Sequence, residues 1–241
     1  MKAIALIVRR ELGAYLRGMS GYVIVALILA VDGLLFNTYA MGGRELLSAE
    51  VLRKFFYFSS GTTMTAAILL SMRLLAEEAH DKTLVLLYTA PVSEWQIAVG
   101  KWLSAFCFLC LMLLLSLYMP LLILVHGTIN PGHLAAGYGG LLLIGAASTA
   151  IGTFASSLTR SQVVAGIAGG AIVVGLLLSW MLARVVDPPF DTIFSYLSFW
   201  DKHFTPFMDG VIHTRDVVYY LSIAFLSLVL TKQVLGARRW R

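Results

Sequence analysis

Residues of chemically reactive types are few in this chain, and their spacing argues against catalysis. Cys107 and Cys110 form a C-x-x-C pair inside an apolar run, where free cysteines ordinarily pack as small apolar side chains. The chain has no H-E-x-x-H motif, and no Ser/His pair lies within its apolar runs. Four histidines without metal-ligand spacing are expected to meet water: His126, His133, His203 and His213. The sequence therefore predicts no metal site and no catalytic residue.

The one Gly-Lys pair does not make a phosphate-binding loop. Gly100-Lys101 is followed by Trp102, whereas such a loop needs Ser or Thr after the Lys and a further Gly five residues before the pair. The chain thus carries no ATPase motif of its own. Energy for active work must come from another chain.

A charged stretch followed by a short apolar one, residues 77–93, is the most informative segment. Glu77, Glu78, Asp81 and Lys82 would each cost kilocalories in hydrocarbon, so this part must lie outside it. Residues 83–90 are too short to span a bilayer and too apolar to be left bare to water. Such a segment needs a partner to dock into. The alternative is a loop whose apolar residues only dip into the lipid headgroups.

Local signals divide this segment into two helical parts. Asp81 is expected to cap two helical turns, which Pro91 ends because it lacks an amide donor. Ser93 and Gln96 then have the spacing of a capping box, and Val92 and Ile97 that of a hydrophobic staple. A new helix should start at Ser93 and continue through Lys101 and Trp102, which suit the membrane interface.

Composition places these motifs in a polytopic membrane protein. The chain has 241 residues, of which 59% are hydrophobic and only 13% charged, about half the charged share of a soluble domain. A net charge of +5 would suggest nucleic-acid binding in a soluble protein, but the basic residues sit at the ends of apolar runs, so no nucleic-acid partner is expected. Six runs are long enough to span: 21–39, 57–75, 102–125, 134–158, 163–186 and 217–235.

Lys and Arg predict the orientation. With six spans, both termini share a side with the 76–101 loop and the 159–162 turn. Basic residues on that side outnumber the others by two to one: Lys2, Arg9, Arg10, Arg17, Arg73, Lys82, Lys101, Arg160, Lys232, Arg238, Arg239 and Arg241, against Arg44, Arg53, Lys54, Arg184, Lys202 and Arg215. The positive-inside rule puts both termini in the cytoplasm.

The first eighteen residues predict an amphipathic helix in the headgroup plane. Apolar residues recur at three- and four-residue steps from Ile4 to Met19, with basic residues elsewhere on the wheel. A cleaved signal peptide ending near residue 40 is the competing interpretation. It is disfavoured because the charged region is long and the apolar run approaches full span length.

Asp32, past the middle of the first span, allows two interpretations. A carboxylate at that depth is expensive unless it faces protein or water. It either lines a translocation path or a subunit interface, or it reaches the outer boundary or lies protonated against Asn37 or a neighbouring span.

Small residues predict the closest helix contact. Ser148, Gly152 and Ser156 repeat every four residues in the fourth span, as Gly166 and Gly170 do in the fifth. The two spans are joined by a short turn and must run antiparallel, so the two stripes can meet. Alternatively, one stripe faces a second permease subunit.

The last long loop, residues 187–216, is rich in aromatic residues among acids and prolines. That composition predicts short helices at the outer interface, which form a gate or contact an external partner.

Several segments resemble the ABC-2 type transporter permeases. The 77–101 loop, with two acids, a charged turn, TLVLLYTAPVS over residues 83–93 and then Gly-Lys, is similar to the cytoplasmic loop of that superfamily, and above all to the gliding-motility-associated and nitrous-oxide-reductase-maturation type. Residues 149–162, 195–201, 210–220 and the Arg-Arg-Trp ending are similar too. The chain departs from the family at Lys82, usually Gly, and at Val85, usually acidic.

The resemblance implies an all-α fold with six transmembrane helices and an interfacial N-terminal helix, of the type V exporter kind, forming one permease domain over residues 1–241. It implies a bacterial cytoplasmic-membrane location, a cytoplasmic ATPase subunit that binds ATP and Mg, a second permease subunit and an external accessory protein. It also implies that residues 83–90 form a coupling helix in a groove of the ATPase. The implied coupling residues are Glu77, Glu78, Asp81, Thr83, Leu84, Leu87, Tyr88, Thr89 and Pro91.

The sequence thus favours a permease subunit that works in a dimer with two ATPase subunits. A non-transporting scaffold that uses the same ATPase for mechanical signalling or for assembly of surface machinery is the alternative. Six spans with only one buried acid do not favour a proton- or ion-coupled carrier. The substrate cannot be inferred from these residues.

Overall fold

The computed structural model describes residues 2–40, 47–83, 92–125, 128–187 and 190–239. Within these ranges every regular element is helical. In chain order they are α1 (Lys2–Arg17), α2 (Met19–Leu35), the π-helix η1 (Phe36–Ala40), α3 (Ser48–Ser71), α4 (Arg73–His80), α6 (Glu94–Ser116), α7 (Tyr118–Leu121), the 3₁₀-helix η2 (Leu122–Val125), α8 (Pro131–Leu158), α9 (Gln162–Ala183), α10 (Phe190–Leu197), α11 (Thr205–Met208) and α12 (Thr214–Arg239).

Six of the helical segments in the described residues are long and apolar enough to cross a membrane: Met19–Tyr39, Ser48–His80, Glu94–Leu121, Pro131–Leu158, Gln162–Ala183 and Thr214–Arg238. The expected all-α fold with six spans is therefore confirmed. The second span begins nine residues before its expected start at Tyr57. The reason is that Val51, Leu52, Phe55 and Phe56 pack into the core, while intervening charges lower the hydropathy of this part.

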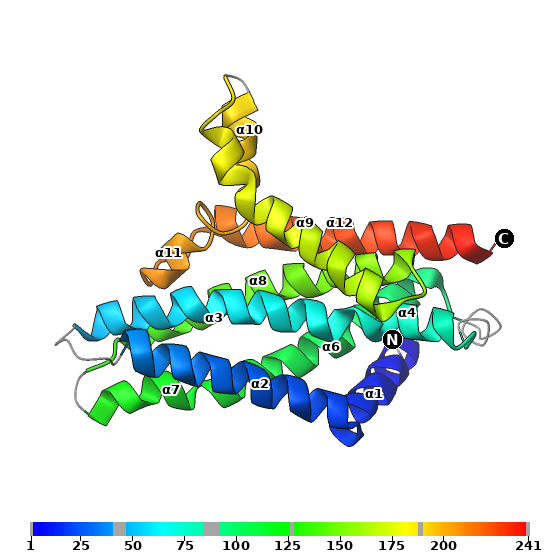
Figure 1. Ribbon diagram of the computed structural model, residues 1–241, viewed down its shortest axis with the longest axis horizontal. Coiled ribbons are helices and arrows are strands. Elements are labelled where there is room, and N and C mark those ends of the chain that lie inside the picture. Colours follow the sequence, from blue (N-terminus) through cyan, green and yellow to red (C-terminus); the bar gives the residue numbers. More distant parts are fainter. Residues whose placement is uncertain (1, 41–46, 84–91, 126–127, 188–189, 240–241) are drawn as a thin grey trace.

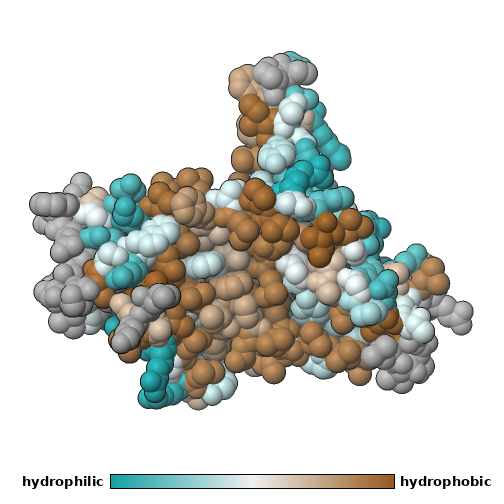
Figure 2. Space-filling model, turned by 180° about the vertical axis from the view of Figure 1, so that it is seen from behind, coloured by the Kyte–Doolittle hydropathy of each residue, from teal (hydrophilic) through white to brown (hydrophobic). Residues whose placement is uncertain are grey.

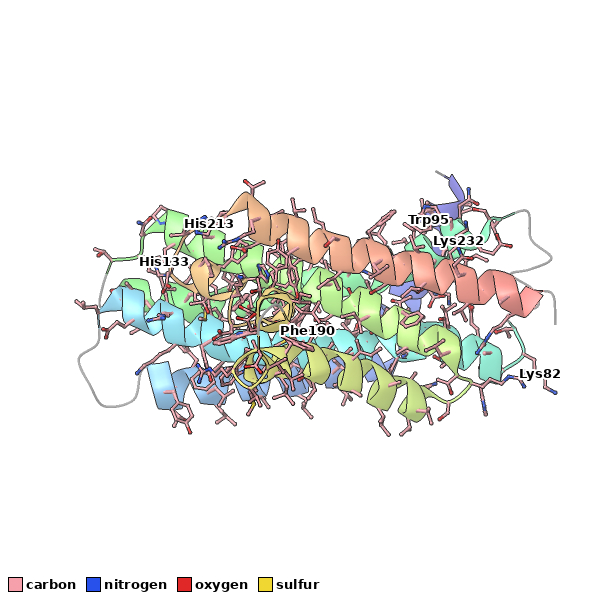
Figure 3. All side chains as sticks on the ribbon, turned by 90° about the horizontal axis from the view of Figure 1, so that it is seen from above. Lys82, Trp95, His133, Phe190, His213 and Lys232 are labelled. Atoms are coloured by element: carbon pink, nitrogen blue, oxygen red, sulfur yellow. The ribbon has the colours of Figure 1, made fainter. Side chains whose placement is uncertain are left out.

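The long helices lie side by side along the long axis of the molecule (Figure 1). Both chain ends lie toward one end of this bundle, together with the C-terminus of α4; we call it the terminal end. The other end, which holds α7, α11 and the start of α3, is the opposite end. Lys82 and Lys232 lie at the terminal end, and His133 and His213 at the opposite end (Figure 3).

Helix α8 is the centre of the bundle. It contacts α3, α6, α9 and α12. Of the residues in its most apolar 18-residue stretch, 78% are buried. Gly, Ala, Ser and Thr make up most of its buried positions, which lets neighbouring backbones approach closely. By contrast, only 22% of the residues in the corresponding stretches of the span that α2 begins and of α9 are buried. These two helices therefore present most of their surface outward.

The α3–α4 junction is a kink held by a side chain from α8. The helix breaks at Met72. Ser156 Oγ accepts hydrogen bonds from the amides of Leu75 (3.0 Å) and Ala76 (2.9 Å), and donates one to the Met72 carbonyl (2.8 Å). A side chain inserted into the backbone ladder is an established cause of a helix kink. Ser156 therefore replaces the hydrogen bonds that the kink removes.

Helix α10 stands away from the bundle (Figure 1). It packs against α9 and has no buried residue. In Figure 2 apolar side chains cover the middle of the bundle, and α10 shows a hydrophobic side toward the terminal end and a hydrophilic side toward the opposite end. This distribution fits the short interfacial helices expected in residues 187–216.

Candidate functional site

Helix α4 ends in a tight turn at residues 81–83. Asp81 was expected to be an N-cap, but it is the C-cap of α4, and its amide donates to the Glu77 carbonyl at 2.9 Å. Lys82 has a φ of +58°, and the Thr83 amide reaches back to the Glu78 carbonyl at 3.0 Å. This is the arrangement of a Schellman motif, whose left-handed position favours Gly. Gly, which the similar permeases usually have at this position, adopts this conformation without strain because it lacks a Cβ. Lys82 adopts it with a Cβ.

Helix α6 begins as expected at the other end of the same loop. The Ser93 amide donates to Gln96 Oε1 (3.1 Å), and the Gln96 amide donates to Ser93 Oγ (3.3 Å). The predicted capping box is therefore confirmed. Val92 packs against the small core cluster that holds Ile97, as the predicted hydrophobic staple requires. The described residues on both sides of the loop are thus anchored.

Four charged side chains from α1, α4 and α6 meet, and we call them the ion cluster: Arg10, Glu11, Glu78 and Lys101. Lys101 Nζ lies 3.0 Å from Glu11 Oε1 and 2.8 Å from Glu78 Oε1, and its side chain is 1% exposed. Arg10 Nη2 lies 2.7 Å from Glu11 Oε1 and also contacts Glu78 Oε1. Two cations and two carboxylates balance each other, which a buried ammonium requires.

The charges of the ion cluster hold one another ionised. Burial raises the pKa of the Glu11 carboxyl, but the neighbouring Lys101 ammonium and Arg10 guanidinium outweigh burial and hold this pKa below its ordinary value of 4.5. The pKa of Arg10 is raised, because its pairing with Glu11 and Glu78 outweighs desolvation. A carboxyl whose pKa is lowered by folding stabilises the fold above its ordinary pKa, and this stabilisation is lost as the pH falls below that value. The contact between α1 and α6 should therefore weaken below about pH 4.5.

These contacts correct one expectation. Lys101 and Trp102 were expected to anchor α6 at the interface, but Lys101 is buried in the ion cluster and the Trp102 indole donates to the Ala146 carbonyl at 3.0 Å. Glu78, one of the implied coupling residues, binds Lys101 and Arg10 within the chain. Glu77 is more exposed and pairs with Arg73 at 3.2 Å. Of the other implied coupling residues, Leu84, Leu87, Tyr88, Thr89 and Pro91 lie outside the described residues.

Asp32 lies against a neighbouring span, α3. Its side chain is 5% exposed, and its Oδ1 accepts hydrogen bonds from Thr62 (2.8 Å) and Ser59 (3.4 Å) of α3. Asn37 is exposed. Thr62 also lines an open groove between α2 and α3, which continues to Leu177 and Trp200. The Thr62 side chain therefore lies between Asp32 and the surface of this groove.

The small-residue stripes meet different neighbours from those expected. A Cβ on Gly152 would fall 1.9 Å from Ser71 Oγ, so the fourth-span stripe faces α3. In the fifth span, a Cβ on Gly169 would lie 3.4 Å from the Gly152 Cα. Gly166 faces Met72, and Gly170 meets nothing within 4 Å. Helices α8 and α9 do pack together, but through a face of α9 turned by one position from the predicted one.

A buried contact between His203 and Asp216 at the opposite end corrects the expectation that His203 meets water. This side chain is fully buried together with Asp216, and its Nδ1 lies 2.7 Å from Asp216 Oδ1. Its Nε2 lies 3.0 Å from the Tyr196 carbonyl, and its ring stacks on Tyr219 at 3.8 Å. The pair fixes the end of α10 on α12.

No group of three or more His, Cys, Asp or Glu that could hold a metal ion occurs in the described residues. The sulfur atoms of Cys107 and Cys110 are not disulfide-bonded. His133 Nε2 lies 2.7 Å from the Met208 carbonyl, so this ring, too, has a protein partner. His126 lies outside the described residues.

Sequence reasoning missed the ion cluster altogether. Its members lie at positions 10, 11, 78 and 101, and each one alone resembles an ordinary interfacial charge. The available signal was Glu11, an acid in an otherwise basic amphipathic helix. Its presence suggests a cationic partner within the chain, because an anionic headgroup would repel it.

Comparison with known proteins identifies a family. The family model described as ABC-2 family transporter protein matches residues 24–191, which extend from the first span into α10. No curated protein matches the sequence significantly.

Proposed function

We propose that this chain, which belongs to the ABC-2 family of transporter proteins and is a permease subunit of an ABC transporter, is driven by a separate ATP-binding subunit. We propose that this partner docks on residues 83–91. The observation that carries the proposal is the loop's attachment. The turn at Lys82 and the capping box at Ser93 delimit the segment, and the ion cluster ties its two flanking helices to α1. Movement of the segment would therefore be transmitted to α1, α4 and α6 together.

The finer features of the proposal follow from sequence and surface. The excess of Lys and Arg at the terminal end supports a cytoplasmic location for that end, in a bacterial inner membrane. Helices α2 and α9 face outward, with only 22% of the residues in their most apolar stretches buried. These outward faces support the presence of a second permease subunit. We also assign the chain to the gliding-motility-associated and nitrous-oxide-reductase-maturation type, on the basis of the 77–101 loop and residues 210–220.

Docking is tested by replacing Leu84 and Leu87 with Asp and purifying the tagged chain from its native membrane. Burying an unpaired charge costs several kcal/mol, so bound ATP-hydrolysing activity should be lost while the chain still inserts. Val211→Asp, at the opposite end, is the matched control and should retain the activity. Full retention of ATPase activity by the double variant would sink the docking assignment.

Transport itself is tested separately from docking. ATP-dependent movement of a substrate into or out of vesicles that contain the assembled complex is expected. ATP hydrolysis that never moves a substrate would favour the scaffold alternative.

A further inference from the structure

A separate groove lies between α1 and α6, and we call it the α1–α6 groove. Its volume is about 600 Å³, which falls within the ~300–1,000 Å³ of known ligand sites. The described residues that line it all come from α1 and α6, so it is distinct from the outward faces of α2 and α9 that we assign to a second permease subunit. Most of its wall is apolar: Ile4, Ala5, Val8, Leu12, Leu16 and Leu103.

Helix α1 presents this groove on one of three sides. A first side packs into the protein, where Ile7 and Tyr15 are buried. A second side carries the exposed Arg10 and Arg17. The groove lies on the third side, whose apolar residues recur at steps of three and four. Helix α1 is inclined to the long axis of the bundle (Figure 1), and the apolar side of such an interfacial helix faces the acyl chains of the membrane.

Leu103 places the apolar wall on the hydrocarbon side of the charged residues. It belongs to the span Glu94–Leu121 and lies about 14 Å along α6 from Glu94. Lys101, two residues nearer the terminal end, is already in the ion cluster, where it binds Glu11 of α1. Arg9 is close to Glu11 in the same helix. The groove therefore has an apolar inner part and a basic outer part, as a phospholipid requires.

Arg9 supplies the charge of the outer part. Among the described residues that line the groove, Arg9 alone is charged. It is exposed, whereas the adjacent Arg10 is paired with Glu11 and Glu78. A phosphate at Arg9 would therefore meet no carboxylate in the described wall. The planar guanidinium of Arg binds phosphate oxygens through two parallel hydrogen bonds.

Gly13 leaves room beside Arg9. It lies about one turn further along α1, in the wall of the groove, and a Cβ there would meet nothing within 4 Å. Gly within a helix is destabilising relative to Ala, and no described neighbour would be crowded by a larger residue here. A ligand that lies against the helix backbone accounts for a Gly at this position.

We propose that the α1–α6 groove binds a phospholipid with a singly anionic headgroup, its acyl chain against Leu12, Leu16 and Leu103 and its phosphate at Arg9. A zwitterionic headgroup is less suitable, because it brings its own ammonium close to the guanidinium. The bound lipid would contact the helix that the ion cluster ties to α4 and α6. The site does not rest on the proposed ATPase partner, because it lies wholly within this chain.

Binding is tested on the purified chain in detergent, without any ATPase, by native mass spectrometry after titration with dioleoyl phosphatidylglycerol. Dioleoyl phosphatidylethanolamine, with the same acyl chains and a zwitterionic headgroup, should bind about fivefold more weakly. Excess glycerol 3-phosphate should not compete, because it lacks the acyl chains. Equal binding of the two lipids would mean that only annular lipid is present, and competition by glycerol 3-phosphate would mean that the site takes a free phosphate; either result would overturn the inference.

Two arginines of α1 separate a site from a diffuse attraction. Arg9→Gln should lower phosphatidylglycerol affinity about fivefold, and Arg9→Lys should restore part of it. Arg17→Gln is the matched control, because Arg17 is equally basic and also exposed but lies outside the groove wall. Equal losses in Arg9→Gln and Arg17→Gln would mean that the lipid is attracted to the whole basic helix, which would contradict the assignment to the groove. The ion cluster should still hold α1 in Arg9→Gln.

A third variant tests the space in the groove without changing its charge. Gly13→Leu should lower the affinity for phosphatidylglycerol, because its side chain would narrow the groove beside Arg9. Gly139→Leu on α8, also in open space but outside the groove, should not. Melting temperatures show whether each variant is folded. Unchanged lipid affinity in folded Gly13→Leu would contradict the site.

The outcome is independent of docking on the α4–α6 loop. A chain that prefers the anionic lipid but never recruits an ATPase would keep this site and lose the proposed function. A chain that recruits the ATPase without any lipid preference would do the reverse.

Discussion

At the residue scale, buried polar side chains make the specific contacts between helices of this bundle. Ser156 holds the α3–α4 kink, Lys101 joins α6 to α1 and α4, and His203 joins the end of α10 to α12. In hydrocarbon, apolar contact between helices gives little preference over lipid, so hydrogen bonds and close packing carry the association. Loss of one such residue should therefore affect stability more than its size suggests.

Ser156→Ala should lower the melting temperature of the detergent-purified chain. The Leu75 and Ala76 amides would lose their shared acceptor, and leaving a buried donor unsatisfied costs about 1–3 kcal/mol. Ser148→Ala on the same helix is the matched control. The Ser148 hydroxyl is buried without a hydrogen-bond partner in the described residues, so its removal should be neutral or stabilising. Equal effects of the two changes would mean that the kink does not depend on Ser156.

Lys101→Met should destabilise the attachment of α1. Two carboxylates would then face each other with only Arg10 to balance them, and breaking a buried pair costs up to about 3–5 kcal/mol. Protease cleavage within α1 should become faster, and adding Glu78→Gln should restore part of the protection. The exposed Arg9→Gln on the same helix should have no effect. Unchanged cleavage in Lys101→Met would contradict the structural role of the ion cluster.

At the element scale, close approach of α8 to α3 depends on the absence of a side chain at Gly152. A Cβ there would overlap Ser71 Oγ at 1.9 Å and approach Ser71 Cβ at 2.9 Å. The two helices are also the pair that meets at the kink. A change at this position therefore disturbs both the helix contact and the Ser156 hydrogen bonds.

Gly152→Ala and Gly170→Ala should have opposite effects on melting temperature. The first forces α8 and α3 apart, and overpacking of this kind costs about 1–3 kcal/mol. The second adds a methyl in open space and raises helix propensity, which favours the fold by up to about 1 kcal/mol. If Gly152→Ala melted at the same temperature as the parent chain, the described packing of α8 on α3 would be wrong.

Sequence reasoning predicted the positions of the helices better than the sides through which they pack. Hydropathy located all six spans, and the Ser93 capping box located the start of α6, because both signals are local. The predicted packing face of α9 was wrong. Ala165/Gly169 and Gly166/Gly170 are equally small pairs, and only the tertiary contacts of Gly169 with Ile68 and Gly152 show which pair faces α8. The ion cluster and the His203–Asp216 pair were missed because their members come from elements that only the tertiary fold brings together.

At the scale of the whole molecule, the two ends of the bundle hold different buried polar groups. The terminal end holds the ion cluster and the residues that flank the α4–α6 loop. The opposite end holds the start of α3 and the His203–Asp216 pair. Helices α3 and α6 run between the two ends (Figure 1), so a displacement at the loop can reach the opposite end along rigid elements.

Labelling from the two faces of the membrane tests this arrangement. In a background without Cys107 and Cys110, cysteines at the exposed positions Lys82 and Val211 should react with an impermeant thiol reagent from opposite sides. Lys82→Cys should be labelled only after the cytoplasmic face is exposed, and Val211→Cys in intact cells. Labelling of both from one side would mean that the number of spans between them is wrong.

The central claim is that an ATP-binding subunit contacts this permease at the loop between α4 and α6. A photo-crosslinking residue placed at Leu87 in the native membrane tests that contact directly, with the same residue at Val211 as the control. Irradiation should join an ATP-binding protein to the chain from position 87 and not from position 211. Crosslinks to an ATP-binding protein from position 211 alone, or lipid adducts alone from position 87, would contradict the account.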